Sequence, residues 1–142
     1  MEYKLNPDFN TIEWSQLTGL FQKVGWGERP SSEIKLAFEK SSFTFFIYDN
    51  NNIVGFGRTM DDGKYYAMLV DIIVHPDYQG KRLGTLIANT LKDKLTGFLF
   101  VTLTSAPDKE DFYKKLGWKK QSLSFLWPMN ENQKRLYCDS EE

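Results

Sequence analysis

The sequence predicts a mixed α/β fold, with a central mixed but mostly antiparallel sheet of six to seven strands and about four flanking helices. Three observations support this prediction. Residues 43–48 and 53–60 are two apolar strand candidates joined by the polar turn 49–52, which predicts a hairpin. Residues 65–74 are apolar on both faces, as is typical of a central strand covered on both sides. The later strands alternate with helices, which predicts a parallel pair.

The N-terminal part is expected to contain a short strand and two helices. Residues 2–6 are the strand candidate, and residues 11–24 have the apolar stripe of an amphipathic helix, formed by Ile12, Leu17, Leu20, Phe21 and Val24. Asn10 or Thr11 is expected to cap this helix with its side-chain oxygen. A loop with two glycines and a proline then precedes a second helix, predicted over residues 32–40.

After the hairpin, the turn at residues 61–63 leads into the central strand. Strict alternation predicts two faces for this strand: Tyr66, Met68, Val70, Ile72 and Val74 on one, and Ala67, Leu69 and Ile73 on the other. A helix is predicted from about residue 83 to residue 95 and should end at Gly97. A strand over residues 98–103, a short helix near residues 110–116 and a last strand over residues 118–127 complete the pattern.

Length and composition limit the possibilities. A chain of 142 residues with 41% hydrophobic residues predicts one domain over residues 1–142, in which the polar residues 131–142 are a candidate loose tail. The formal net charge of −1 gives no broad attraction to nucleic acid or to an anionic membrane surface. No apolar run is long enough for a membrane-spanning helix, and no N-terminal signal segment is recognisable, so a cytoplasmic protein is expected.

A candidate ligand-binding loop joins the central strand to the helix that follows it. Pro76 stops the strand, a loop with two glycines follows, and the helix is expected to begin near Arg82. The first turn of a helix leaves backbone N–H groups without internal partners and carries about half a positive elementary charge. Such a terminus binds phosphate through its backbone. The sequence therefore predicts a ligand with a diphosphate, held by Gln79, Gly80, Lys81, Arg82, Leu83, Gly84 and Thr85.

This loop resembles motif A of the GCN5-related N-acetyltransferase (GNAT) family, (Gln/Arg)-x-x-Gly-x-(Gly/Ala). Gln79 and Gly84 match the first and last positions of the motif, but Arg82 stands where the motif has glycine. A non-glycine residue is tolerated there if its φ is negative and is strained if its φ is positive. The Arg82 guanidinium would also offer a charged donor to a phosphate.

A second segment resembles motif B of the same family, (Leu/Phe)-Tyr-x-x-x-Gly-(Phe/Tyr/Trp), and the matching residues are Phe112, Tyr113, Gly117 and Trp118. Together the two motifs make the chain similar to GNAT proteins over nearly its whole length and imply a GNAT-like fold. The resemblance implies acetyl-CoA as the co-substrate, with its pyrophosphate on the amides of the motif A loop. The resemblance also implies that the pantetheine arm of acetyl-CoA pairs with the backbone of Ile72, Ile73 and Val74.

The implied activity is transfer of an acetyl group from acetyl-CoA to a primary amine of a small molecule, by direct attack in a ternary complex. Two alternatives stay open: a catalytically weak CoA-binding module that serves as a sensor or partner, and a protein acetyltransferase that acts on N-termini or lysines. The predicted partner is a small-molecule amine, with no nucleic acid and no membrane, and the chain is expected to be a monomer or a homodimer.

Three residues are candidates for proton transfer. By resemblance, the Tyr113 hydroxyl points at the sulfur of CoA and donates to the departing thiolate; the alternative is a tyrosine that only packs on the sheet. Asp71 interrupts an apolar face, so it is either a general base, direct or through water, or a structural carboxylate held by backbone N–H groups or by Arg58. His75 is a further candidate base, or a turn residue.

The acceptor side is less defined by sequence. Trp26 lies between two glycines in the loop after the first helix, a region that by resemblance lies over the acceptor site. The nearby Glu28 and Glu33 carry the charge that attracts a cationic amine. No metal is expected, because the single histidine has no clustered histidine or cysteine beside it.

Overall fold

The computed structural model describes residues 1–140, which form two compact units, Met1–Thr104 and the part of the chain from Ser105 onward. The expectation of one domain over residues 1–142 stays a prediction. Within residues 1–140, no helix is both long and apolar enough to cross a lipid bilayer.

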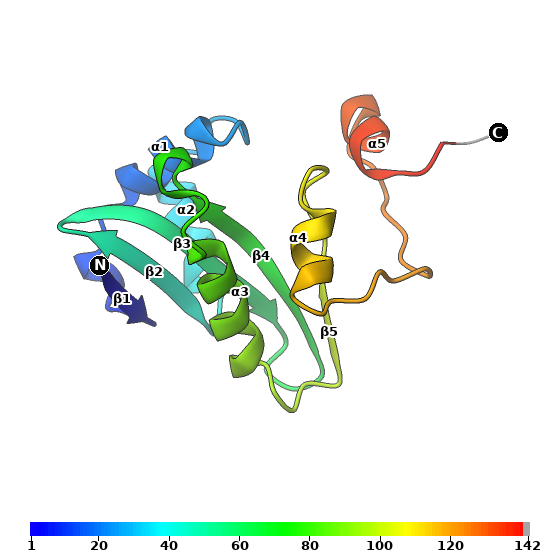
Figure 1. Ribbon diagram of the computed structural model, residues 1–142, viewed down its shortest axis with the longest axis horizontal. Helices are drawn as coiled ribbons and strands as arrows, with labels where there is room; N and C mark the ends of the chain where they lie inside the picture. Colours follow the sequence, from blue (N-terminus) through cyan, green and yellow to red (C-terminus); the bar gives the residue numbers. More distant parts are fainter. Residues whose placement is uncertain (141–142) are drawn as a thin grey trace. The chain divides into compact units, whose positions relative to one another are not determined.

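The first unit is built on one sheet with the strand order β1-β2-β3-β4-β5 (Figure 1). The first three strand pairs are antiparallel, and β4 and β5 are parallel. The strands are β1 (Glu2–Leu5), β2 (Thr44–Asp49), β3 (Asn52–Asp61), β4 (Tyr66–Val74) and β5 (Phe100–Leu103). The mixed α/β fold, the hairpin and the parallel pair are therefore confirmed, although the described residues hold five strands rather than six or seven.

Helices cover both faces of this sheet. The helices of the first unit are α1 (Trp14–Lys23), α2 (Ser31–Glu39) and α3 (Leu83–Lys94), with short 3-10 helices η1 (Phe9–Thr11) and η2 (Pro76–Tyr78). In Figure 1, α3 crosses in front of the strands, whereas α1 and α2 lie behind them. An aromatic core fills the α1–α2 side: the rings of Phe21 and Phe38 have their centroids 5.4 and 5.9 Å from that of Phe56. Such ring pairs stabilise a core beyond the area that they bury.

The first helix begins later than predicted. Asp8 caps η1 by accepting from the Asn10 N–H at 2.9 Å, and Ile12 is extended, with φ −89° and ψ 128°. This extended residue prevents a continuous helix, so α1 begins at Trp14 and its N-cap, Glu13, makes no side-chain cap. The predicted cap by Asn10 or Thr11 is therefore wrong.

A β-bulge interrupts β4 at its middle. Phe56 is opposite Ile73 and Arg58 is opposite Val70, so Gly57 alone faces the two residues between them. One of these two is Asp71, whose φ of 54° is rare for a residue with a side chain. The extra residue reverses the alternation of side chains beyond it. The predicted faces of the strand are therefore wrong after Asp71: Val70 and Ile73 share the α1–α2 face, and Ile72 faces α3.

Gly57 is required by this packing. A Cβ at this position would lie 2.7 Å from Ile87 Cγ2 and 3.0 Å from Leu91 Cδ1, both on α3. Because Ile87 Cγ2 is fixed by the branch at Cβ, α3 itself must shift. We expect Gly57→Ala to lower the free energy of unfolding by about 2 kcal/mol, as overpacked cores do.

Urea denaturation followed by circular dichroism measures this loss. Gly19→Ala is the matched control, because a Cβ on Gly19 in α1 meets nothing within 4 Å. Alanine favours a helix by up to about 1 kcal/mol over glycine, so this control should be neutral or stabilising. Equal unfolding midpoints for the two variants would contradict the close approach of β3 and α3.

The second unit contains helices α4 (Glu110–Lys115) and α5 (Glu131–Tyr137). The last strand predicted over residues 118–127 does not form, although polar and apolar residues alternate there. A strand needs the backbone of a partner, and the described part of this unit offers only helices. Leu123, Phe125 and Trp127 are correspondingly exposed. The candidate loose tail, in contrast, contains α5.

Candidate active site

The loop between β4 and α3 presents a row of unpaired backbone donors. Within residues 1–140, the N–H groups of residues 80–85 make no hydrogen bond of good geometry, and the first backbone bond of this turn runs from Leu86 N to Arg82 O. Gly80, Lys81 and Arg82 are exposed. Six consecutive N–H groups at the positive end of α3 are therefore free to donate, as the predicted phosphate site requires.

Three side chains at the start of this loop fix its position through hydrogen bonds. The Tyr78 hydroxyl donates to Asp49 at the end of β2, and Gln79 Nε2 donates to the Val74 carbonyl at 3.2 Å. The bond to Asp49 raises the pKa of the Tyr78 hydroxyl, which stays protonated as a donor. His75 Nδ1 accepts from the Asp77 N–H at 3.0 Å and so caps η2. His75 thus has the contacts of a turn residue.

The backbone of the loop turns in alternating senses. Gly80 has a φ of 82° and Arg82 a φ of 63°, whereas Lys81 between them is not left-handed. Alternation of this kind points successive N–H groups into one concavity that binds anions. Arg82, the N-cap of α3, therefore takes a left-handed conformation that favours glycine, the residue of motif A at this position.

Replacing Arg82 by glycine should relieve this strain. A left-handed residue with a side chain is disfavoured by about 1–2 kcal/mol, and the flexibility of glycine in the unfolded chain offsets part of the gain. We expect Arg82→Gly to raise the free energy of unfolding by about 1 kcal/mol in a urea titration. Arg82→Ala removes the same charge but retains the left-handed backbone strain. An equal rise in the free energy of unfolding in both variants would therefore contradict the attribution of the gain to strain.

Asp71 lies at the bulge of β4 between two arginines. Its Oδ2 accepts from Arg58 Nε at 2.9 Å, and its Oδ1 accepts from Arg29 Nη1 at 3.3 Å. Arg58 also donates to the Ala37 carbonyl and the Ser41 hydroxyl, both at 3.4 Å. The Asp71 side chain is only 11% exposed. Both oxygens therefore have cationic partners, and the arrangement matches a structural carboxylate held by Arg58.

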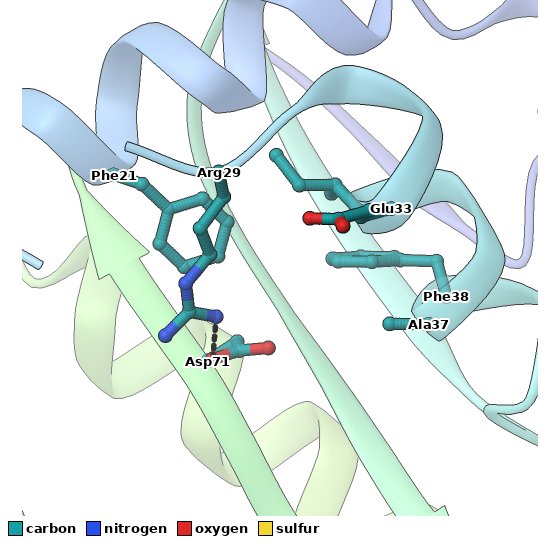
Figure 2. Close-up of a pocket in the computed structure, with 7 residues that line it drawn as sticks. Phe21, Arg29, Glu33, Ala37, Phe38 and Asp71 are labelled. Atoms are coloured by element: carbon teal, nitrogen blue, oxygen red, sulfur yellow. Dashed lines mark hydrogen bonds and ion pairs between the residues drawn. The ribbon is translucent and has the colours of Figure 1, made fainter. Parts of the chain in front are cut away.

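A cavity of about 80 Å³ opens beside Asp71 on the α1–α2 side of the sheet (Figure 2). Its residues come from α1, the loop after it, α2 and β4: Phe21, Arg29, Glu33, Ile34, Ala37, Phe38 and Asp71. Figure 2 shows the Arg29 side chain passing the Phe21 ring to reach Asp71, with Glu33 on the opposite wall. The cavity thus combines aromatic walls with charges of both signs.

The predicted acceptor residues differ in their positions. The Trp26 ring lies 6.0 Å from the Phe21 ring, beside the cavity, and is 38% exposed. Glu28 is exposed, and its side chain has no hydrogen-bond or ion-pair partner within the described residues. Arg29 was not predicted as a site residue, and no local signal marks it, since its partner Asp71 is 42 positions away.

No group of three or more metal-binding side chains converges within residues 1–140.

Tyr113 belongs to α4 in the second unit. Its ring meets those of Phe112 and Trp118 edge to face, with centroids 4.9 and 6.5 Å away. Burial raises the pKa of the Tyr113 hydroxyl to about 12. The hydroxyl is therefore protonated throughout the physiological range, as a proton donor must be.

Comparison with known proteins gives a consistent result. Residues 16–126 match the family model of the acetyltransferase (GNAT) domain. The chain is 35% identical over 121 residues to the uncharacterized N-acetyltransferase ycf52 of Pyropia yezoensis, which covers 81% of this chain and 68% of that protein. The matched regions span 63–68% of the first four curated relatives, so these proteins are longer than the matched segment.

Solved structures agree with this result at the level of the fold. A protein of unknown function from meticillin-resistant Staphylococcus aureus, a probable acetyltransferase, has a TM-score of 0.77 and 22% identity over 91% of this chain and 99% of that one. A GNAT family acetyltransferase from Streptococcus pneumoniae has a TM-score of 0.76 and 20% identity, over 92% and 98% of the two chains.

Proposed function

Because the chain belongs to the GNAT acetyltransferase family, we propose that it transfers an acetyl group from acetyl-CoA to a primary amine of a small molecule, by direct attack in a ternary complex. The observation that carries the proposal is the row of six unpaired N–H groups at residues 80–85. In the proposal, these groups hold the pyrophosphate of the cofactor, and the Lys81 and Arg82 side chains add positive charge.

The edge of β4 supplies a place for the pantetheine arm. Pairing between β4 and β5 ends at Leu69 and Leu103, so within the first unit no strand covers residues 70–74 on that side. An extended chain with amide groups can add to such an edge through main-chain hydrogen bonds. We assign this role to the backbone of Ile72, Ile73 and Val74, which leads directly into the phosphate-binding loop.

In the proposed reaction, the neutral amine attacks the thioester carbonyl, the new N–C bond forms, and the C–S bond breaks. The Tyr113 hydroxyl gives its proton to the departing thiolate. Since both oxygens of Asp71 already accept hydrogen bonds from guanidinium groups, we assign the removal of the amine proton to water and a structural role to Asp71.

Two classes of acceptor compete. Among the matched proteins, one from Oryza sativa is named a serotonin N-acetyltransferase, and one from Glycine max a histone acetyltransferase. The small cavity beside Asp71 favours a slender amine over a folded protein surface. Cellular location stays a prediction: a cytoplasmic protein was expected, whereas the names of several relatives include the word chloroplastic.

The test is release of free thiol from acetyl-CoA, measured with a panel of small primary amines and lysine-containing peptides. Release with small amines supports the proposal. Release only with peptides indicates a protein acetyltransferase. If CoA binds in calorimetry but no acceptor releases thiol, the chain is a CoA-binding sensor or partner module; if CoA does not bind, the phosphate-site assignment is wrong.

A further inference from the structure

The Arg29 guanidinium occupies a site with the features of an ammonium receptor. It lies 4.3 Å from the centre of the Phe21 ring and 5.8 Å from that of Trp26, and it donates to the Asp71 carboxylate at 3.3 Å. Aromatic faces beside a carboxylate are the surroundings in which proteins bind organic cations. The protein therefore holds one of its own cations where an external cation would be stabilised.

Arg29 is the weaker of the two partners of Asp71. Its single contact to the carboxylate is long, and its side chain is 42% exposed, whereas that of Arg58 is 12% exposed with a contact of 2.9 Å. If the Arg29 side chain leaves, Asp71 still has a buried counter-ion. Thr18 Oγ1 donates to the Arg29 carbonyl at 2.9 Å, so the backbone stays in place while the flexible side chain swings toward solvent.

The charges that remain favour a cation. Glu33 lines the same cavity, and within the described residues its carboxylate has no hydrogen-bond or ion-pair partner. Once the Arg29 side chain has left, two carboxylates, of Asp71 and Glu33, face the single positive charge of Arg58. The local charge is then negative and attracts an ammonium ion.

The size of the cavity indicates what must move. With Arg29 in place, its volume is about 80 Å³, roughly half of the 150 Å³ in which an engineered apolar cavity binds benzene. An alkylamine with more than a few heavy atoms therefore needs the space that the Arg29 side chain fills.

We propose that Arg29 occupies the ammonium site of the acceptor in the free protein, and that a primary alkylammonium ion displaces it by binding over Phe21 between Asp71 and Glu33. This inference deepens the proposed function, because it names the acceptor as a cationic alkylamine and makes Arg29 the residue that limits its entry. Arg29 is a specificity-determining residue here and takes no part in the chemistry.

The test is binding of propylammonium chloride, followed by the NMR signal of the Trp26 indole N–H at constant ionic strength. Without its internal competitor, Arg29→Ala should bind propylammonium at least about tenfold more tightly than the wild type. Propan-1-ol, which has the same shape without charge, should bind both proteins equally weakly. Lys23→Ala removes one positive charge from α1 outside the cavity and should behave as the wild type.

The proposal would be overturned if Arg29→Ala bound propylammonium no more tightly than the wild type does. It would also be overturned if the substitution increased the affinity for propan-1-ol by the same factor as the affinity for propylammonium. Arg29→Gln, which retains most of the side-chain volume, is the second variant if the alanine variant does not fold, and it should show the same preference for the charged probe. Since no cofactor is present, a negative result here leaves the binding of CoA and the release of thiol unaffected, so failure of this inference is distinguishable from failure of the proposed function.

Discussion

Thr85→Glu is expected to weaken CoA binding by about 100-fold while the fold is retained. Thr85 is the third residue of α3, and its N–H is the last of the six unpaired donors. A carboxylate at this position of a helix is favourable, because it caps the free amides and opposes the helix dipole. The same carboxylate repels a pyrophosphate. Two unit charges about 6 Å apart repel by about 3 kcal/mol at an effective dielectric constant of about 20, which gives the 100-fold estimate.

Isothermal titration calorimetry with CoA measures the loss, and Thr85→Gln is the matched control, with the same length and no charge. The control should bind CoA within a few-fold of the wild type, and both variants should unfold at or above the wild-type temperature. If the glutamate and glutamine variants lose affinity equally, the steric effect dominates and the anion-binding role of these amides is disproved.

Tyr113→Phe is expected to lower kcat by about 100-fold and to change the affinity for CoA less than threefold, the range expected when a general acid is removed. The hydroxyl acts in the proposed mechanism only as the C–S bond breaks, so its removal should not affect ground-state binding. Tyr137→Phe removes a hydroxyl from α5 in the same unit and serves as the control. Unchanged kcat in Tyr113→Phe would assign this tyrosine to packing.

The pH dependence gives a second view of Tyr113. A phenol donates a proton only in its neutral form, which predominates below its pKa. Because burial raises that pKa from 10.0 to about 12, the donor form persists through pH 10 and is lost only as the pH approaches 12. Below pH 10, the pH profiles of kcat for the wild type and for Tyr113→Phe should therefore have the same shape. In particular, the wild type should show no alkaline decline that is absent from the variant. Such a decline would show that the Tyr113 hydroxyl itself ionises below pH 10 and is therefore less buried in the complex.

Local patterns predicted most of the fold. The hairpin, the central strand and α3 all appear close to the predicted bounds, because their signals are apolar periodicity and turn residues within a few positions. The helix α5 also had a local signal that was missed: Asn130 accepts from the Gln133 N–H, and Gln133 accepts in return from the Met129 N–H. This reciprocal cap can be recognised from residue types alone.

The remaining differences arise from contacts between distant residues. The bulge at Asp71 depends on the opposing Gly57 and on α3. The identity of residue 71 as an aspartate does not by itself reveal that its backbone is left-handed. Residues 118–127 have the alternation of a strand, but alternation does not supply a partner edge. The free N–H groups of the predicted phosphate loop could be anticipated because they follow from adjacent residues: a strand end, two glycines and a helix start. The position of Arg29 could not, because the tertiary structure alone brings it to the cavity.

The anchors beneath the phosphate loop have a thermodynamic consequence. Tyr78, Gln79 and His75 fix the loop through Asp49, Val74 and Asp77 before any ligand arrives. The conformational entropy lost on ordering this backbone therefore belongs to folding and not to ligand capture, so each amide contributes its full interaction energy on binding. The strain at Arg82 is likewise present before any ligand binds, so the proposed binding of a pyrophosphate would not have to supply that energy.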